Sequence, residues 1–509
     1  MQDKHVRMLV FGMEQTVSVL KFGGTSVGSG ERIRRVAAII ADIFKDPSTP
    51  FPVVVVSAMS GITDQLLRIA RAACSQEREQ YEQELTTLRQ KHLEAAEKVT
   101  ASERGRAQLE IELEAGFVAL AQDVERLRQA AEEKQAVHLR TAAVASWGER
   151  LSVLLVAAAV RELGVEAEPV RKEIIITSHP AHDPSQPFGV VVGADPLGEE
   201  TRANAQAVVR PLVEQGIVPI AAGFMGRTIT GFVTTLGRNG SDYSATVIGA
   251  ALDCAEVSIY TDVDGVLTAD PRLVANAQLL PRLSYAEAAR LSWFGAKVLH
   301  PRTLIPIAPR NIPVRVRNSF RPHLRGTVIG PEDGRPSGAG AISIRRKLAL
   351  ITVESTDLFG APENAGQVFV LAARAGAAPV AICSSSGHHL SFVIDEEAAQ
   401  SVVALLQHDM DKAVWKVSSR TGLAACACIG SGFTADPKSS ARAITALARE
   451  RIPVLTNGAS EQGITLIVED RDSERALRCL HRDLVAPVIP LVRRPEAVVT
   501  VKNETLLKA

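Results

Sequence analysis

The residues most able to do chemistry lie near the N-terminus, in the stretch VLKFGGTSVGSGERI. A β-rich run ends there in two adjacent glycines, and a helical pattern follows. A glycine turn that opens a helix can bind phosphate, because the first N–H groups of the helix lack partners and its dipole favours an anion. The lysine before the glycines would add a cation, although the order differs from that of a Walker loop, GxxxxGK[ST]. The residues that would form such a site are Lys21, Gly23, Gly24, Thr25 and Ser26.

The same stretch fits a second template. GTSVG (24–28) matches G-x-S-x-G, the nucleophile elbow of esterases, in which Ser26 would be the nucleophile. An esterase would also need a later aspartate and a histidine, for which His300 is the candidate histidine. This alternative leaves Lys21 without a role.

A second glycine turn favours phosphoryl transfer over acyl hydrolysis. TTLGRNGSDYSA (234–245) also follows a strand pattern, opens a helix pattern and carries Arg238 and Asp242. A polyphosphate nucleotide needs cations and N–H donors around it, and its acceptor must be held in line. Two glycine turns at strand ends, with Lys21, Arg238 and Asp242 converging, would meet these needs, whereas an esterase needs only one elbow.

The elements that must position these residues alternate between strand and helix. The run 16–22 reads as a strand and 32–44 as a helix, and FPVVVVSAMSG (51–61) is typical of a strand buried on both faces of a parallel sheet. Further strands are predicted at 173–177, 216–224, 231–237, 256–263 and 312–318. This alternation predicts an α/β domain with a parallel sheet covered on both faces.

The segment 75–134 interrupts the alternation, because it is polar, helix-favouring and almost free of helix breakers. We predict a helical hairpin inserted at about 75–136. A solvated excursion is the favoured interpretation over a coiled coil that binds a partner.

Length and composition exclude several classes of protein. A chain of 509 residues should form about two to four domains. Lys+Arg and Asp+Glu both number 57, so zero net charge gives no electrostatic reason to expect nucleic acid or an anionic membrane as a partner. Six cysteines are too few for a disulfide framework, and the Cys426–Cys428 pair lacks a second pair at zinc spacing. No metal site is expected from the protein's own side chains.

The location expected for the chain is the cytoplasm. No apolar run approaches the roughly 18 residues of a membrane span. The N-terminus also lacks the pattern of a signal peptide, since Glu14 interrupts its apolar stretch.

The C-terminal third contains an internal repeat. Residues 351–395 match 425–470 at a constant offset of 74 residues, and each copy has the pattern of a βαββαβ unit. Neither copy gathers an acid, a base and a nucleophile, so both are interpreted as binding modules. The predicted domains are a catalytic domain (1–325), a linker (326–345) rich in Pro and Gly, a first module (346–415) and a second module (416–509) with a C-terminal strand.

Taken together, the motifs resemble the aspartate kinases of the amino-acid kinase family. The resemblance rests on KFGGTSV (21–27), VVSAMSGITD (55–64), SWGERLS (146–152), TTLGRNGSDYSA, YTDVDGVLTADPR (260–272) and FGAKVLHPRT (294–303). The repeats resemble the paired ACT domains of these enzymes. The implied fold is a three-layer α/β/α amino-acid kinase (carbamate kinase-like) sandwich followed by two ferredoxin-like ACT domains. GRNGSD and TDVDG are similar to the branch fused to homoserine dehydrogenase, but we expect no dehydrogenase part before the chain stops at Ala509.

The resemblance implies transfer of the γ-phosphoryl group of ATP to the β-carboxylate of L-aspartate, which gives 4-phospho-L-aspartate. This is the first step of lysine, threonine and methionine biosynthesis. Two anions must meet, so the main task is to cancel negative charge. By resemblance Lys21 acts at the transferred phosphoryl group, and Asp242 organises the lysine and the substrate.

The resemblance also implies contacts with the substrate. Arg238 would bind its α-carboxylate through a bidentate fork, and Glu149 would bind its ammonium. Ser57 and Thr63 would contribute hydroxyl groups. The alternative for Glu149 is an ordinary carboxylate at the start of a helix.

The nucleotide contacts implied by the family are Gly23, Gly24, Thr25, Ser26, Gly240, Ser241, Thr261, Asp262, Arg272 and Lys297. Asp262 and Asp264 could instead be plain turn residues around Gly265. Leu267 departs from the family, whose members usually carry tyrosine there. Mg²⁺ is expected as a companion of the ATP phosphates.

Paired ACT domains imply regulation by an end product, lysine or threonine, and the branch resemblance favours threonine. The candidate effector residues are Asp357, Asn364, Ser384 and Asn457. Pairing of ACT domains between chains implies a homodimer. Two alternatives stay open: an amino-acid kinase for another carboxylate substrate, and a catalytically silent ACT sensor of amino acids.

Overall fold

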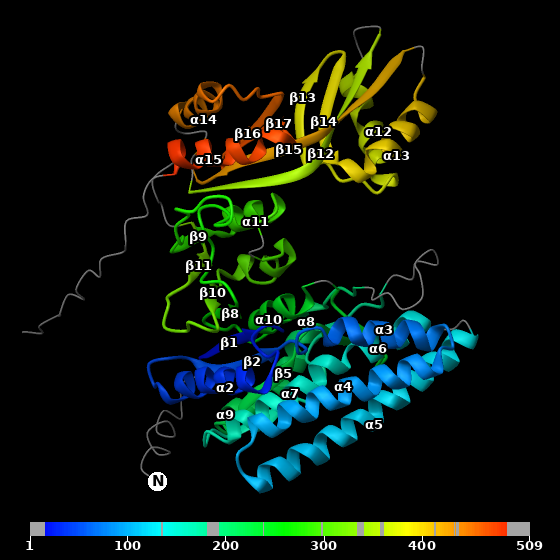
Figure 1. The fold of residues 1–509 in the computed structure, drawn as a ribbon, viewed down its shortest axis with the longest axis vertical. Helices are drawn as coiled ribbons and strands as arrows, with labels where there is room; N and C mark the ends of the chain where they lie inside the picture. Colours follow the sequence, from blue (N-terminus) through cyan, green and yellow to red (C-terminus); the bar gives the residue numbers. More distant parts are fainter. Residues whose placement is uncertain are drawn as a thin grey trace, which may run out of the picture.

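The protein is described by a computed structural model covering residues 16–133, 136–180, 193–237, 239–296, 299–332, 340–356, 361–411, 414–431, 433 and 437–485. A larger α/β unit with a helical hairpin along one side joins a smaller unit built on a second sheet (Figure 1).

The larger unit is organised around an eight-stranded sheet with the order β3-β5-β2-β1-β8-β10-β11-β9. Its strands are β1 (Val17–Phe22), β2 (Phe51–Val56), β3 (Ala167–Pro169), β5 (Val218–Ala222), β8 (Val257–Thr261), β9 (Arg282–Ser284), β10 (Val314–Asn318) and β11 (Thr327–Gly330). The six strands from β3 to β10 are parallel, so their carboxyl ends share one edge. Every residue of β1 and β2 is buried, as expected for strands covered on both faces.

Helices cover both faces of this sheet and make three layers (Figure 1). α10 and α8 pack together on one face, and α2 and α7 pack together on the other. The helices of this unit are α2 (Gly30–Lys45), α3 (Ile62–Cys74), α6 (Val137–Ala145), α7 (Trp147–Arg161), α8 (Gly198–Val208), α9 (Arg210–Glu214), α10 (Gly240–Ala251) and α11 (Tyr285–Trp293), with the 3₁₀ turns η1 (Pro301–Leu304) and η2 (Ala308–Arg310).

The stretch Val137–Arg161 is long and apolar enough to cross a membrane by length and composition alone. It is the α6–α7 segment, and 83% of its most apolar window is buried inside the protein. It therefore has the character of a core helix.

Two of the predicted strands belong to a different sheet from the one expected. β4 (Ile176–Thr177) and β7 (Val233–Thr235) join β6 (Met225–Thr228) in a separate three-stranded sheet. This small sheet delivers the second glycine turn to the start of α10.

The helical hairpin is present as α4 (Arg78–Val99) and α5 (Glu103–Glu133), but it is not a solvated excursion. Both helices bury a stripe of residues in the main core, and α4 packs against α2, α3 and α7. The buried residues are Tyr81, Leu88, His92, Ala95, Ala96 and Val99 of α4, and Leu109, Leu113, Gly116, Leu120, Val124 and Leu127 of α5. The high polarity of the segment comes from the outward faces and hid this stripe.

The smaller unit is a single six-stranded sheet with the order β13-β14-β12-β15-β17-β16. Its strands are β12 (Ala341–Ser355), β13 (Ala381–Ser386), β14 (His389–Asp395), β15 (Trp415–Ile429), β16 (Thr456–Ser460) and β17 (Gly463–Glu469). Its helices are α12 (Ala361–Arg374), α13 (Glu396–Asp409), α14 (Pro437–Arg449) and α15 (Ser473–Leu484), with the 3₁₀ turn η3 (Asp470–Asp472).

The two repeats are not consecutive modules, because they share strands. Residues 348–355 of β12 pair with 415–423 of β15 in the first repeat, whereas 341–345 pair with 425–429 in the second. The second repeat therefore takes its fourth strand from residues that precede the first repeat.

This exchange changes the predicted boundaries. The expected linker (326–345) contains β11, which pairs in the main sheet, and the start of β12. The C-terminal strand expected at the end of the chain falls beyond Val485 and lies outside the described residues.

Candidate active site

The two glycine turns meet at an ion pair. Lys21 leaves β1 near its carboxyl end, and Asp242 stands in the first turn of α10, directly after the second glycine turn. The Lys21 Nζ to Asp242 Oδ1 distance is 2.5 Å, and the two side chains are only 9% and 20% exposed. Residues 221 positions apart in the sequence thus form one partly buried pair.

The first turn needs glycines because its neighbours are close. A Cβ on Gly23 would lie 3.2 Å from Lys21 Nζ, and one on Gly24 would lie 3.0 Å from the Ala58 carbonyl oxygen. Gly23 N–H also donates to the carbonyl of Tyr260 on β8 (3.2 Å). The turn is therefore packed between the ends of β2 and β8, beside the lysine.

The nucleophile-elbow interpretation does not fit this geometry. Ser26 is buried, and its Oγ donates to Ser319 Oγ (2.8 Å) just after β10. His300 Nδ1 accepts from the backbone of Arg302 and caps η1. A serine nucleophile must present its oxygen at an open turn, whereas Ser26 ties the first turn to β10.

Glu149 lies in the first turn of α7 and is 2% exposed. Burial raises the pKa of its carboxyl to about 8, although a backbone hydrogen bond at Ala58 and the charge of Lys21 oppose the rise. In the described part of the chain its Oε2 has no hydrogen-bond partner. A buried carboxyl with an unused oxygen near a cation is suited to receive another cation, such as a substrate ammonium.

The other predicted substrate residues surround the turn after β2. The Ser57 N–H donates to the Phe22 carbonyl (3.1 Å), which fixes this turn against the end of β1. Thr63 stands in the first turn of α3 and is half-buried. Arg238 lies outside the described residues.

The predicted nucleotide residues divide into two groups. Gly240 and Ser241 start α10 beside Asp242, and Thr261 ends β8, where its Oγ1 donates to Asp262 (3.1 Å). Arg272 is instead 79% exposed and pairs with Asp270, which lies in a segment that packs on the smaller unit. Lys297 lies outside the described residues.

Asp264, not Asp262, holds the turn that follows β8. It accepts a hydrogen bond from Asn318 (2.7 Å) and pairs with Arg321, next to Gly265, whose φ is +143°. Leu267 forms an isolated bridge with Leu279.

A third turn lies at this edge, after β5, and it was not among the predicted site residues. Phe224 has φ = +63°, a strained value for a residue with a side chain, and its ring lies 2.8 Å from where a Cβ on Gly240 would stand. A Cβ on Gly223 would lie 2.8 Å from Ser241 Cβ. The glycine that follows the apolar run IVPIAA was the available signal.

Comparison with known proteins identifies the family. The model of the amino acid kinase family matches residues 16–318, more than half of the chain. The chain belongs to the amino acid kinase family. An ACT-domain model also matches residues 427–484, which cover most of the second repeat and the following helix α15.

Similar proteins include a bifunctional aspartokinase/homoserine dehydrogenase 2 from Arabidopsis thaliana, 33% identical over 488 residues that cover 91% of this chain and 50% of the relative. Aspartokinase 3 from the same plant is 32% identical, with 91% and 80% covered. A crystal structure of E. coli aspartokinase III in complex with aspartate and ADP superposes with a TM-score of 0.72 at 29% identity, covering 92% of this chain and 99% of that one. The chain spans about half the length of the bifunctional relatives it matches.

The ACT part of this amino acid kinase brings the second strands of its two units together. A Cβ on Gly458 of β16 would lie 3.5 Å from the Ile382 carbonyl oxygen of β13. Of the candidate effector residues, Ser384 lies on β13, Asn457 is exposed on β16, and Asn364 lies on α12. Asp357 lies outside the described residues.

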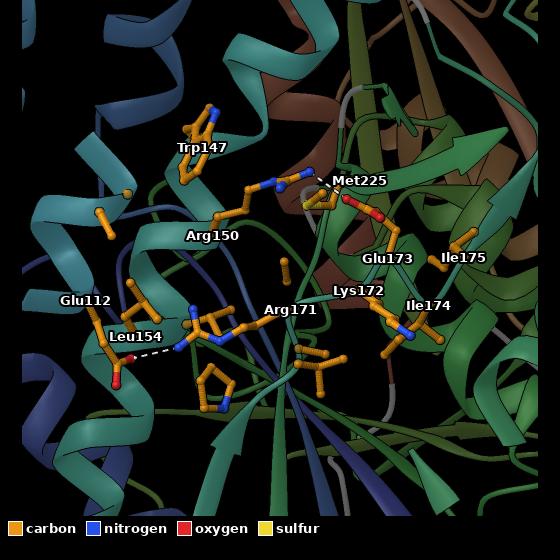
Figure 2. A pocket seen from close by; sticks show the side chains of 17 residues that line it. Glu112, Trp147, Arg150, Leu154, Arg171, Lys172, Glu173, Ile174, Ile175 and Met225 are labelled. Atoms are coloured by element: carbon orange, nitrogen blue, oxygen red, sulfur yellow. Dashed lines mark hydrogen bonds and ion pairs between the residues drawn. The ribbon is translucent and has the colours of Figure 1, made fainter. Parts of the chain in front are cut away.

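A separate cavity of about 200 Å³ lies between α5, α7 and the segment 169–175 (Figure 2). Four of its charged side chains form ion pairs, Arg150 with Glu173 (2.5 Å) and Arg171 with Glu112 (3.2 Å), and Lys172 also lines it. None of the predicted site residues of the kinase lines it. Because its ion pairs are already formed within the protein, we assign it no role in catalysis.

Proposed function

We propose that this amino acid kinase is an aspartate kinase, which transfers the γ-phosphoryl group of ATP to the β-carboxylate of L-aspartate. The observation that carries the proposal is the Lys21–Asp242 pair where the two glycine turns meet. Similarity over most of the chain to proteins named aspartokinases supports it.

Lys21 is proposed to act at the transferred phosphoryl group. A carboxylate oxygen of aspartate forms a bond to the γ-phosphorus while the bond to the β–γ bridging oxygen breaks, and ADP leaves. A fixed cation in a partly buried site is worth more than one in water, because charge interactions grow as the dielectric falls. Asp242 holds the ammonium group of Lys21 in place. No general base is needed, because an aspartate carboxyl is already ionised at neutral pH.

The remaining residues are proposed to hold the two substrates. Glu149 takes the ammonium of aspartate, Arg238 its α-carboxylate, and Ser57 and Thr63 contribute hydroxyl groups. The nucleotide is bound by the first glycine turn, the start of α10, Thr261 and Asp262.

Mg²⁺ is proposed to arrive with the nucleotide and to be held mainly by its phosphates. The described residues contain no group of three or more His, Cys, Asp or Glu side chains able to form a metal site by themselves. The ion would screen the phosphate charge.

The paired ACT units are proposed to bind threonine or lysine near Ser384 and Asn457, and pairing of these units between chains would make a homodimer. We further propose a cytoplasmic enzyme at the first step of lysine, threonine and methionine biosynthesis. All six cysteines are free thiols, which suits a reducing compartment.

The test is release of ADP from MgATP with L-aspartate or with L-glutamate as acceptor. We expect turnover with aspartate at least tenfold above that with glutamate. Turnover with glutamate alone would identify a different amino acid kinase, and no turnover with any acceptor alongside tight amino-acid binding would identify a sensor. Threonine and lysine are then added separately, and inhibition by either one identifies the effector.

A further inference from the structure

The inserted hairpin reaches the loop between β2 and α3, which carries Ser57 of the proposed site. Lys91, on α4, donates from Nζ to the carbonyl oxygen of Ser60 (2.6 Å). Ser60 in turn donates from Oγ to the carbonyl oxygen of Gly24 (2.9 Å). Two hydrogen bonds therefore connect α4 to the first glycine turn, through the loop that also carries Ser57.

We propose that Lys91 is a positioning residue for phosphoryl transfer, which acts through Ser60 on the peptide plane between Gly24 and Thr25. The inference deepens the proposed kinase function and rests on it. Nothing in the sequence pattern marks this lysine, which stands among the many charged residues of the hairpin.

The planarity of the peptide group gives the contact its consequence. The Gly24 carbonyl and the Thr25 N–H belong to one rigid trans unit and point in opposite directions. When Ser60 holds the carbonyl on one side, the N–H is fixed toward the other side. Arg32 Nη1 holds the next carbonyl, that of Thr25 (2.9 Å), but the Ser26 N–H of that peptide plane already donates to the Gly23 carbonyl (2.8 Å). The direction of the Thr25 N–H, which can be offered to a phosphate, thus depends on the Ser60 side chain outside the turn.

The hairpin is fixed firmly enough to serve as an anchor. A Cβ on Gly30, at the start of α2, would lie 2.5 Å from Lys98 Cβ and 2.7 Å from the Ala95 carbonyl oxygen, so α2 and α4 are as close as a glycine permits. On the other side, Glu84 of α4 accepts from Arg68 of α3 (2.8 Å). Helix α4 is therefore held by α2, which follows the first glycine turn, and by α3, which follows the 57–61 loop.

The contact of Lys91 with Ser60 is made in a partly desolvated position. Lys91 is half-buried, and burial lowers the pKa of its ammonium. A hydrogen bond from a charged donor to a carbonyl is stronger in such a place than one from a neutral donor. Its loss would leave the Ser60 carbonyl without this donor and free the loop to shift.

The experiment compares Lys91→Met with Lys91→Arg and Lys98→Met in the full chain. Lys98→Met is the matched control, because it removes from the same helix a lysine whose pair with Glu31 is exposed at both ends. We expect Lys91→Met to lower kcat about 10- to 100-fold while KM for aspartate changes less than kcat, since small misplacements of reacting groups have effects of this size. Lys91→Arg should recover most of kcat, and Lys98→Met should match the wild type.

A merely structural role predicts a different result, in which Lys91→Met lowers the melting temperature and the active fraction but leaves kcat per folded molecule unchanged. That result, or a kcat for Lys91→Met within twofold of Lys98→Met, would overturn the inference.

Hydrogen exchange separates this inference from the proposed function. Amides in 24–28 and 57–61 should exchange faster in Lys91→Met than in Lys98→Met, whether or not aspartate is the substrate. Unchanged exchange would overturn the positioning role even in an active enzyme. Faster exchange in a protein that transfers no phosphoryl group to aspartate would instead overturn the aspartate kinase assignment.

Discussion

At the scale of single residues, the Lys21–Asp242 pair affects both the stability of the protein and the proposed catalysis. A partly buried ion pair is costly to desolvate, and it is strongly destabilising to break by removing one partner. Its presence at the meeting of two glycine turns is understandable if the lysine must be available to an incoming anion. Stability and activity should therefore respond differently to changes at this pair.

Replacing Lys21 by methionine tests this separation. We expect Lys21→Met to reduce turnover by about 10³-fold, because it removes the cation from a preorganised site, and to lower the melting temperature, because Asp242 is left without its partner. The double variant Lys21→Met/Asp242→Asn should recover stability without recovering turnover. Lys45→Ala, an exposed lysine on α2, is the control. Turnover in the double variant closer to that of the wild type than to that of Lys21→Met would contradict the role given to Lys21.

Glu149 should make both stability and substrate binding depend on pH. Its carboxyl has a pKa of about 8 in the folded protein, above the ordinary value of 4.5, so the native state binds the proton more tightly than the unfolded state. The stability it contributes is complete below pH 4.5 and is lost as the pH rises through 8, with a slope of at most about 1.4 kcal/mol per pH unit.

Substrate binding should respond to pH in the opposite direction. The ammonium of aspartate favours the ionised carboxylate, so KM for aspartate should fall between pH 6.5 and pH 8.5. Urea unfolding and steady-state kinetics across this range, repeated with Glu149→Gln, check both dependences. Identical profiles for the variant and the wild type would exclude Glu149 as their source.

At the scale of elements, the close contact between α2 and α4 sets the position of the first turn. Gly30 allows this contact, and an added Cβ would meet backbone atoms of α4 that cannot move aside easily. The hairpin is therefore part of the framework of the site and not an appendage to it.

Gly30→Ala should lower the free energy of unfolding by about 1–3 kcal/mol, the usual cost of overpacking, in spite of the better helix propensity of alanine. Gly198→Ala is the matched control, because Gly198 also begins a helix but has no atom within 4 Å of its added Cβ. It should leave stability unchanged or raise it by about 0.4–1 kcal/mol. Urea midpoints measure both variants, and equal midpoints would show that α2 and α4 can separate without cost.

At the scale of the whole molecule, α11 joins the kinase to both ACT units (Figure 1). Trp293 Nε1 donates to the Val380 carbonyl (3.2 Å) just before β13, and Arg290 donates to Ser460 on β16 and Thr465 on β17. The same helix thus contacts the second strand, or its approach, in each unit. A displacement of either strand would be transmitted to the kinase through one element.

Arg290→Met should weaken this coupling. The guanidinium is partly buried, which lowers its pKa. Loss of its hydrogen bonds in this partly desolvated place should therefore weaken the attachment of α11 to the ACT units. We expect calorimetry to show one unfolding transition for the wild type and two separated transitions for the variant, with aspartate turnover retained. Arg272→Met, which removes an exposed pair with Asp270, is the control for stability only. A single unchanged transition in Arg290→Met would indicate that other contacts join the units.

The sequence by itself determined the local features of this protein. The two glycine turns, the buried strands that lead to them and the hairpin helices all depend on periods and spacings within a short stretch of neighbouring residues. The repeat in the C-terminal third is visible as self-similarity of the sequence at a constant offset. These features were sufficient to predict an α/β domain in which Lys21 and Asp242 converge, whereas the amino-acid kinase fold was predicted from the resemblance of the motifs.

Only the tertiary structure decided which distant segments touch. Ser26 donates a hydrogen bond to Ser319, and the hairpin packs against α2. Phe224 lies against Gly240, and residues 341–345 complete the second ACT unit. Each of these contacts joins segments whose own patterns fit several partners equally well. The choice among partners is made by the simultaneous packing of the whole core, which no local period encodes.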